Sequence, residues 1–269
     1  MFPMNPLRED RSADGLLLLR SEPLESAGFG HAFSTAVGPD GGTFDLATAG
    51  ESPVGTPREI AEASLERFAA AFGGRRSVET VTQVHGAAVV TTPVTPDAKA
   101  DAIIVGDSMT IAAVRTADCV PILIGCPRTG LAAAVHAGWR GIVADVAGAA
   151  VDRLRACGAE PRTMLAAIGP AIGTEAFEIG AEVAREFETA RLGEFVHGGP
   201  GRSTADLHGA AVARLLAAGM ERERIDGEPL CTASDHRFFS HRRDPDRAGR
   251  HLSGIAGIDA GRDSNRRVL

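Results

Sequence analysis

Hydrophobic and polar positions follow two different spacings along this chain, and each spacing predicts a different kind of element. Short apolar or β-branched runs between turn residues indicate strands, whereas apolar residues three or four positions apart indicate helices. The predicted strands cover 16–19, 78–85, 100–106, 110–114, 120–125, 131–136, 163–168 and 224–231. The predicted helices cover 57–72, with Thr56 as the capping residue, 141–157, 175–188 and 205–218.

These elements alternate without an internal repeat, a low-complexity tract or a linker. This order predicts an α+β fold, a mixed α/β sandwich, in one domain from residue 15 to residue 269. Residues 1–14 are predicted to form a loose tail. Residues 37–52 are rich in Gly, Pro, Asp and Thr and predict a loop. The Arg-rich stretch from Ser234 onward is expected to be irregular.

Composition narrows the class of protein. The chain has 269 residues, of which 44% are hydrophobic, and a formal net charge of −7, which argues against a nucleic-acid or anionic-membrane partner. We find no apolar run of membrane-spanning length and no signal peptide. Four scattered cysteines do not form a disulfide scaffold. We therefore expect a cytoplasmic protein with small-molecule partners, either a monomer or a weak homodimer.

Several familiar motifs are absent. The chain has no G-x-S-x-G elbow, no phosphate-binding P-loop, no complete dinucleotide fingerprint, no H-E-x-x-H and no zinc-deaminase pattern. Tyrosine is absent as well, which excludes tyrosine-based chemistry. Any active site must therefore be built from residues that are far apart in the sequence.

Three residues at predicted strand ends have the chemistry of metal ligands. They are His85, Cys119 and His136, and His136 is followed at once by a glycine-containing turn. Two imidazoles, one thiolate and an open fourth position are typical of catalytic zinc. A lone strand-end histidine is more often a hydrogen-bonded packing residue, and a lone cysteine in an apolar stretch is usually part of the core. By strand alternation Cys126 faces away from Cys119, so we expect Cys126, and likewise Cys157, in the core.

Two arginines are candidates for binding an anion. Arg140 lies at the predicted start of a helix, where free N–H groups and the helix dipole favour negative charge. Arg242 follows two phenylalanines and ends a nearly apolar stretch. Either guanidinium could instead serve structure, Arg140 by pairing with a carboxylate and Arg242 as part of a solvated surface.

Five motifs give the chain a specific resemblance. They are Thr82-Gln83-Val84-His85-Gly86, Thr116-Ala117-Asp118-Cys119-Val120-Pro121, His136-Ala137-Gly138-Trp139-Arg140-Gly141, Ile168-Gly169-Pro170-Ala171-Ile172-Gly173, and Cys231-Thr232 with Ser240-His241-Arg242-Arg243-Asp244. In this order, from about Phe33 to His251, the chain resembles the YfiH family, also called the laccase-domain, polyphenol-oxidoreductase or peptidoglycan-editing-factor family.

The resemblance implies a zinc-dependent purine nucleoside phosphorylase that acts on adenosine, inosine and methylthioadenosine and also deaminates adenosine. It assigns the zinc to His85, Cys119 and His136. It also implies a sandwich fold shared with deamidase toxins of the cytotoxic-necrotising-factor type. For this reaction Asp118 and His241 are the acid–base candidates, and Arg140 and Arg242 are the phosphate candidates.

One departure from the family pattern concerns the phosphate. Ala36 stands where relatives tend to carry an arginine, after Phe33-Ser34-Thr35. We therefore expect phosphate binding to be weaker here than in relatives that keep the arginine.

Other functions remain open at this stage. Cys119 could be the nucleophile of a metal-free hydrolase or deamidase with His136 as its base. A peptidoglycan-processing role is a further alternative. A multicopper oxidase would need many histidines, several of them in His-x-His pairs, and this chain has eight histidines and no such pair. A single His₂Cys site could still hold copper in a blue-copper arrangement, especially with an axial methionine; Met109 is the nearest candidate in sequence, and nothing else favours it.

Overall fold

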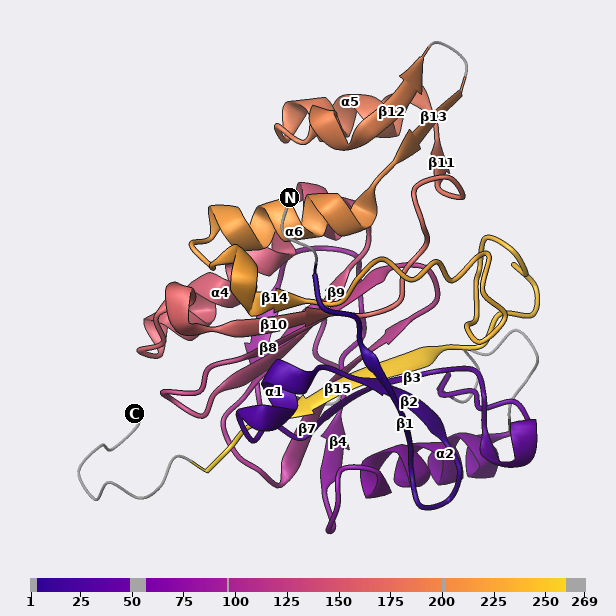
Figure 1. Cartoon of the computed structure of the whole chain (residues 1–269), viewed down its shortest axis with the longest axis vertical. Coiled ribbons are helices and arrows are strands. Elements are labelled where there is room, and N and C mark those ends of the chain that lie inside the picture. The colour runs from indigo at the N-terminus through magenta and orange to yellow at the C-terminus, as the bar shows by residue number, and fades with distance from the viewer. Residues whose placement is uncertain (1–3, 49–56, 96, 200–201, 260–269) are drawn as a thin grey trace.

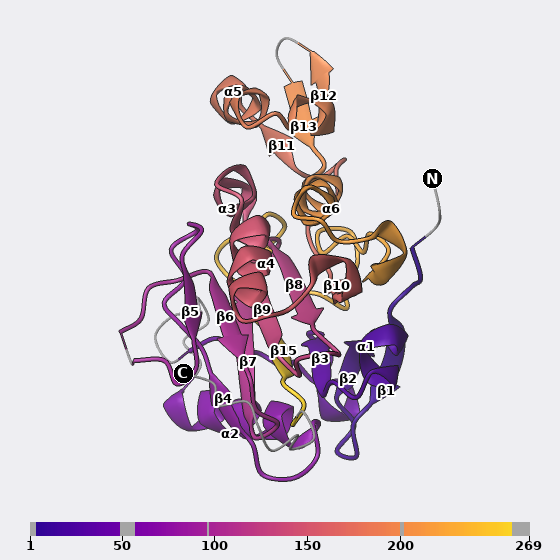
Figure 2. The ribbon, with the colours of Figure 1, turned by 90° about the vertical axis from the view of Figure 1, so that its left-hand side faces the viewer.

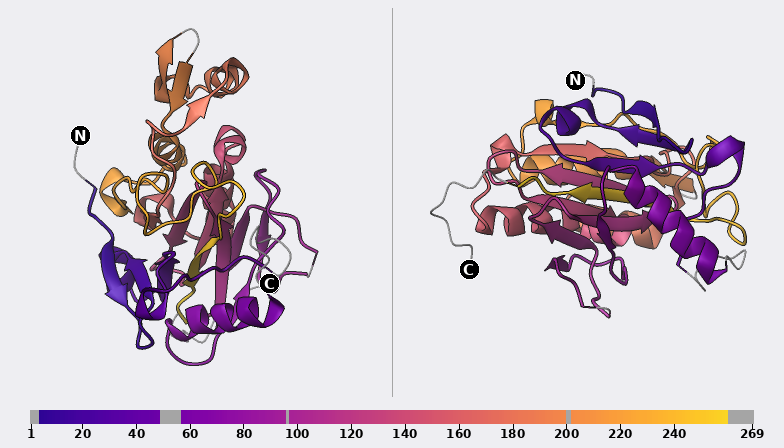
Figure 3. Two further views of the ribbon diagram at one scale, coloured as in Figure 1. Left: turned by 90° about the vertical axis from the view of Figure 1, so that its right-hand side faces the viewer. Right: turned by 90° about the horizontal axis from the view of Figure 1, so that it is seen from below.

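Two six-stranded sheets pack face to face at the centre of the molecule (Figures 1 and 3). The computed structural model describes residues 4–48, 57–95, 97–199 and 202–259. The first sheet has the order β1 (Arg8–Arg11), β2 (Leu17–Arg20), β3 (His31–Ser34), β15 (His251–Ala256), β7 (Thr110–Thr116) and β4 (Ser77–Glu79). The second has the order β14 (Ile225–Asp226), β10 (Leu165–Ile168), β8 (Val120–Gly125), β9 (Ala132–Ala137), β6 (Ala102–Val105) and β5 (Val89–Thr91).

The inner core lies between the two sheets. Phe33, Val114 and Ile255 from the first sheet pack with Leu123 and Ala134 from the second, and all five are fully buried. Most neighbouring strands in both sheets are antiparallel, with β4–β7, β5–β6 and β10–β14 as the parallel pairs. Strands buried on both faces explain why their sequences are continuously apolar rather than alternating.

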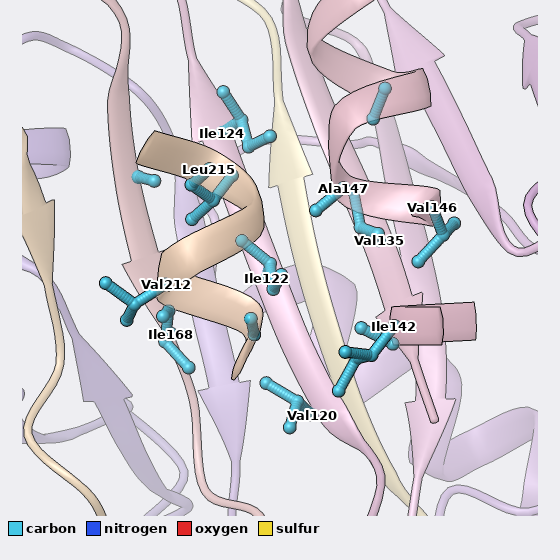
Figure 4. Packing of buried hydrophobic residues seen from close by; sticks show 14 of the residues in the cluster. Val120, Ile122, Ile124, Val135, Ile142, Val146, Ala147, Ile168, Val212 and Leu215 are labelled. Atoms are coloured by element: carbon cyan, nitrogen blue, oxygen red, sulfur yellow. The ribbon is translucent and has the colours of Figure 1, made fainter. Parts of the chain in front are cut away.

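Helices cover the outer face of each sheet. Helix α2 (Arg58–Ala70) packs Phe68 against Leu18 and Ile111 on the outer face of the first sheet. Helices α3 (Trp139–Val143), α4 (Val146–Ala156) and α6 (Leu207–Ala217) cover the second sheet, where their apolar side chains meet those of β8 and β9 (Figure 4). The α+β sandwich predicted from the sequence is therefore confirmed.

A small arm projects from one end of the sandwich (Figures 1 and 2). It contains a three-stranded sheet in the order β11 (Glu178–Ile179), β13 (Arg202–Ala205) and β12 (Val196–Gly199), together with α5 (Ala181–Thr189). The remaining helices are α1 (Glu22–Ser26) and the single 3-10 turns at Pro39–Gly41, Pro161–Thr163, Gly193–Phe195 and Arg222–Arg224. No helix of the described ranges has the length and apolar character needed to span a bilayer.

Several sequence predictions about local structure need correction. Residues 8–11 form β1, which pairs antiparallel with β2, so at least this part of the predicted tail is ordered. The predicted strand 78–85 ends at Glu79. The helix predicted at 175–188 begins only at Ala181, after β11. The strand predicted at 224–231 covers only Ile225–Asp226. The region from Ser234, predicted to be irregular, contains β15, a central strand of the first sheet.

The predicted helix 141–157 is divided into α3 and α4. Asp145 separates them with a φ of 63°, and its side chain caps α4 by accepting a hydrogen bond from the Gly148 N–H. The Arg214 guanidinium of α6 donates to the carbonyls of Ile142 and Val143 at the end of α3. These carbonyls are therefore satisfied without a continuous helix. The predicted Thr56 cap of α2 lies outside the described residues.

Candidate metal centre and substrate cavity

The three predicted metal ligands meet at one end of the sandwich. Cys119 lies in the turn between β7 and β8, and His136 lies in β9, opposite Pro121 of β8. His85 lies in a turn rather than at the end of a strand, with a φ of 58°. Their ligand atoms all lie within 4.8 Å of one another, and they form the one His/Cys/Asp/Glu cluster of this kind in the described residues.

Two imidazoles and one thiolate are ligands that both zinc and copper take, so the residues of this cluster fit a metal ion of that kind. Gly138 supplies the space, because a Cβ at this position would come within 2.9 Å of the His85 ring and 3.0 Å of the Cys119 sulfur. Any larger residue at position 138 would therefore press on two ligands at once.

Asp101 orients the cluster from behind. Its Oδ1 accepts hydrogen bonds from His136 Nδ1 at 2.8 Å and from the His85 backbone N–H at 2.9 Å, and its Oδ2 accepts one from the Gly86 N–H at 2.7 Å. Because a carboxylate only accepts, His136 carries its proton on Nδ1 and presents Nε2 to the site. A carboxylate behind a ligating histidine is a recurrent feature of metal sites.

The buried charges favour a thiolate at Cys119. Burial by itself raises the pKa of this thiol, but hydrogen bonds with His136 and His85 outweigh burial and the pKa is lowered. Burial by itself likewise lowers the pKa of His136, but Asp101 and the Cys119 thiol outweigh it and the pKa is raised. The thiolate is the form of cysteine that binds metals and acts as a nucleophile.

A cavity of about 710 Å³ opens directly on this cluster. Its walls include His85, Cys119 and His136, the predicted residues Asp118, His241 and Arg242, and two further arginines. These arginines are Arg115, whose Nε donates to the Leu46 carbonyl, and Arg250, whose guanidinium donates to the Ala248 and Gly249 carbonyls. The two carbonyls that Arg250 contacts are neutral, so these contacts leave its positive charge in place.

The arm contributes an aromatic wall to the cavity. Phe177, at the base of the arm, lines the cavity, and the Arg242 guanidinium lies 5.3 Å from its ring centroid. The same guanidinium donates to the carbonyls of Ala176 at 3.0 Å and Glu178 at 3.2 Å. Arg242 therefore fixes the base of the arm and also faces the cavity.

The structure places Asp118 in the cavity wall but uses both of its carboxylate oxygens. Oδ1 accepts the Thr232 hydroxyl at 2.6 Å, and Oδ2 accepts the Arg242 backbone N–H at 2.7 Å. Its backbone φ of 88° turns the chain sharply just before Cys119. These contacts tie three loops together around the metal ligands. Among the predicted acid–base candidates, His241 is exposed and lines the cavity without such contacts.

Arg140 is not brought to this cavity. It is exposed and its guanidinium stacks on Trp139 at 4.3 Å from the ring centroid, outside the cavity lining. Met109 is 59% exposed at the start of β7, the end of that strand opposite to Cys119, and no described methionine lines the cavity. The structure therefore provides no axial methionine for a copper site.

The prediction for Cys126 is confirmed and the one for Cys157 is wrong. Cys126 is 2% exposed among apolar residues, and burial raises its pKa to about 12. Cys157 is exposed because it follows the last turn of α4, beyond the buried face of the helix.

Comparison with known proteins shows the family of this chain. Residues 36–257 match the family model described as multi-copper polyphenol oxidoreductase laccase. The chain belongs to this family. It is 36% identical over 243 residues to a purine nucleoside phosphorylase of Deinococcus radiodurans, covering 89% of this chain and 92% of that one. It is 41% identical over 170 residues to purine nucleoside phosphorylase YfiH of Shigella flexneri, covering 60% and 67%.

The fold of the laccase family is also seen in a solved structure. The crystal structure of YlmD from Geobacillus stearothermophilus superposes with a TM-score of 0.79 at 27% identity, covering 94% of this chain and all of that one. The resemblance to the YfiH family inferred from five short motifs is thus confirmed over nearly the whole chain.

Sequence reasoning missed several residues of this family member's site. Asp101, Arg115, Arg250 and Phe177 line or support the cavity, and none was selected from the pattern. Asp101 gave one usable signal: it is an acid at the start of an otherwise apolar predicted strand. A carboxylate in such a position needs buried hydrogen-bond donors.

Proposed function

We propose that this chain is a zinc-dependent purine nucleoside phosphorylase acting on adenosine, inosine and methylthioadenosine, with adenosine deaminase activity in the same cavity. The observation that carries the proposal is a single cavity that joins a His₂Cys cluster, two arginines without a described ion pair (Arg242 and Arg250) and an aromatic wall. The names of the curated relatives support the same reaction.

Each part of the cavity has a role in this proposal. His85, Cys119 and His136 would hold the zinc, which would act as a Lewis acid on an oxygen of the substrate or of water. Arg242 and Arg250 bind the phosphate dianion. Arg140 is not assigned this role because it lies outside the cavity lining.

The nucleoside meets the remaining walls. A purine base is flat and apolar on its faces, so it stacks against Phe177. In phosphorolysis a phosphate oxygen bonds to the anomeric ribose carbon while the bond from that carbon to the purine nitrogen breaks. The leaving purine nitrogen takes a proton, for which His241 is the exposed candidate in the wall. Asp118 then holds the loops rather than transferring a proton.

The test uses protein purified without added metal. We expect about one zinc per chain and release of hypoxanthine from inosine that depends on added phosphate. Adenosine deamination, which uses water, is expected to proceed without phosphate. A protein that binds no zinc and releases no base would refute the proposal.

A metal-free cysteine hydrolase is the second candidate, because the thiol of Cys119 is flanked by His136 and His85 and has a lowered pKa. That function predicts a protein without stoichiometric metal whose activity survives chelator treatment and is abolished by thiol alkylation.

A further inference from the structure

The edge of β7 next to the cavity is covered in an unusual way. Strand β4 pairs with β7 only along Thr110–Ala112, so the later residues of β7 have no β4 partner. At Arg115 the side chain of Gln83 takes that place. Its Nε2 donates to the Arg115 carbonyl at 2.7 Å, and its Oε1 accepts the Arg115 N–H at 2.7 Å. One side-chain amide thus satisfies both backbone groups of one strand residue.

This amide pair connects the two segments that carry metal ligands. Gln83 lies two residues before His85, and Arg115 lies four residues before Cys119. The segment around His85 is also held by Asp101, which accepts from the backbone N–H groups of residues 84, 85 and 86, and by the backbone pairing of Thr82 with residues 98–100. Asp101 fixes this segment against β6 and β9, whereas Gln83 fixes it against β7. The two contacts act from different sides.

The same contact sets the position of a cavity wall. Arg115 and Gln83 both line the cavity, and the Arg115 Nε also donates to the Leu46 carbonyl. On the side of β7 away from β15, the backbone from which the Arg115 side chain enters the cavity is therefore held by Gln83. A change at Gln83 would move a metal-ligand segment and a cavity arginine together.

We propose that Gln83 is a positioning residue that sets the separation of His85 from Cys119 and the placement of Arg115 in the cavity. This inference rests on the proposed zinc site. The contact suits an amide, because its NH₂ group donates to the Arg115 carbonyl while its oxygen accepts from the Arg115 N–H. Glutamate keeps the acceptor but turns an oxygen toward the Arg115 carbonyl. Methionine keeps the length of the side chain but makes neither of the two strong hydrogen bonds to Arg115.

The experiment compares Gln83→Glu and Gln83→Met with the wild-type protein and with Val84→Ala. Val84 adjoins His85 and has a side chain that is 48% exposed, so it is the matched control. Zinc affinity is measured by competition with a chromophoric chelator, and the ligand geometry is followed by the absorption of the cobalt-substituted protein. We expect both Gln83 variants to bind zinc roughly 10- to 100-fold more weakly, as for other residues that orient ligands. The cobalt spectrum should shift, and Val84→Ala should match wild type.

A purely structural role for Gln83 gives a different result. In that case urea unfolding of the metal-free protein shows lower stability, while zinc affinity and the cobalt spectrum stay at wild-type values, and the inference is overturned. If Gln83→Met does not fold, Gln83→Glu decides alone. If the wild-type protein binds zinc and the Gln83 variants bind it equally well, the positioning role is refuted and the proposed function is unaffected. A wild-type protein without zinc refutes both.

Discussion

Replacing Asp101 by asparagine tests the metal centre through a residue that does not touch the metal. The carboxylate is completely buried and receives four hydrogen bonds, from His136 Nδ1 and from the N–H groups of Val84, His85 and Gly86. Asparagine supplies one oxygen and one NH₂ group in place of two oxygens. If the asparagine oxygen faces His136, the NH₂ group faces backbone N–H donors. If the NH₂ group faces His136, this histidine must carry its proton on the ring nitrogen that should bind the metal.

The magnitude follows from these contacts. A hydrogen bond to a charged group contributes about 1.5–3 kcal/mol, and the variant loses the charge and at least one such bond. We expect the free energy of unfolding of the metal-free protein to fall by about 3 kcal/mol, and zinc affinity to fall roughly 10- to 100-fold. Urea denaturation measures the first quantity, and competition with a chromophoric chelator measures the second.

Asp226→Asn provides the matched control. Asp226 is also buried and accepts the Ser21 hydroxyl, but it lies in β14, at the far edge of the second sheet. This variant should lose stability and keep its zinc affinity. Wild-type zinc affinity in Asp101→Asn would refute the assignment of His136 as an Nε2 ligand oriented by Asp101.

Three further predictions use the same assays. Cys119→Ala should lose zinc and phosphorolysis together with little change in stability, whereas Cys231→Ala should keep both; full zinc content in Cys119→Ala would contradict the site. Arg250→Ala should raise the phosphate KM roughly 10- to 150-fold and leave adenosine deamination near wild type, whereas Arg140→Ala should change neither; equal loss of both activities would place Arg250 on the nucleoside. Burial lowers the pKa of His31 from 6.5 to about 4, so between these pH values the unfolded chain binds more protons and stability falls as pH falls, by up to about 3 kcal/mol. His31→Gln should lose this part of the pH dependence in urea unfolding, and an unchanged slope would show that His31 is not buried in its neutral form.

The strands that the sequence predicts well are those whose apolar runs end at clear turns. The predicted strand at 120–125 matches β8 residue for residue, and Leu131–His136 differs from β9 by one position at each end. Both are buried on two faces, so local pattern and tertiary packing favour the same structure. The helix ending before Gly219 is predicted for the same reason, since its Asp206 cap and apolar face agree.

β15 is not predicted from the sequence, because His251–Ala256 contains His, Ser and Gly among its apolar residues. Tertiary packing decides there: β3 and β7 flank it on both sides, and a glycine at 254 avoids a Cβ that would meet Ile111 at 2.8 Å. The arm shows the same limit, because the strands at 178–179, 196–199 and 202–205 are stabilised by pairing with one another. A short strand of this kind has little pattern of its own.

The candidate site likewise has residues that the sequence predicts and residues that it does not. Ligand-type residues beside glycine-containing turns were visible in the sequence, and the structure brings His85, Cys119 and His136 together. The supporting residues were not visible, because their roles depend on which segments become neighbours. Asp101 reaches His136 across 35 positions, and Gln83 reaches Arg115 across 32. A single sequence carries no record of such pairs.

The supporting contacts also explain how two unfavourable backbone conformations persist at the site. His85 and Asp118 have φ values of 58° and 88°, in the left-handed region that costs a non-glycine residue roughly 1–2 kcal/mol. Asp101 holds the first turn through backbone N–H groups, and the carboxylate of Asp118 holds the second through Thr232 and the Arg242 N–H. Each strained turn therefore has a buried carboxylate that offsets its cost. Each turn also presents a metal-ligand residue to the same point, so the carboxylates of Asp101 and Asp118 support the geometry of the cluster.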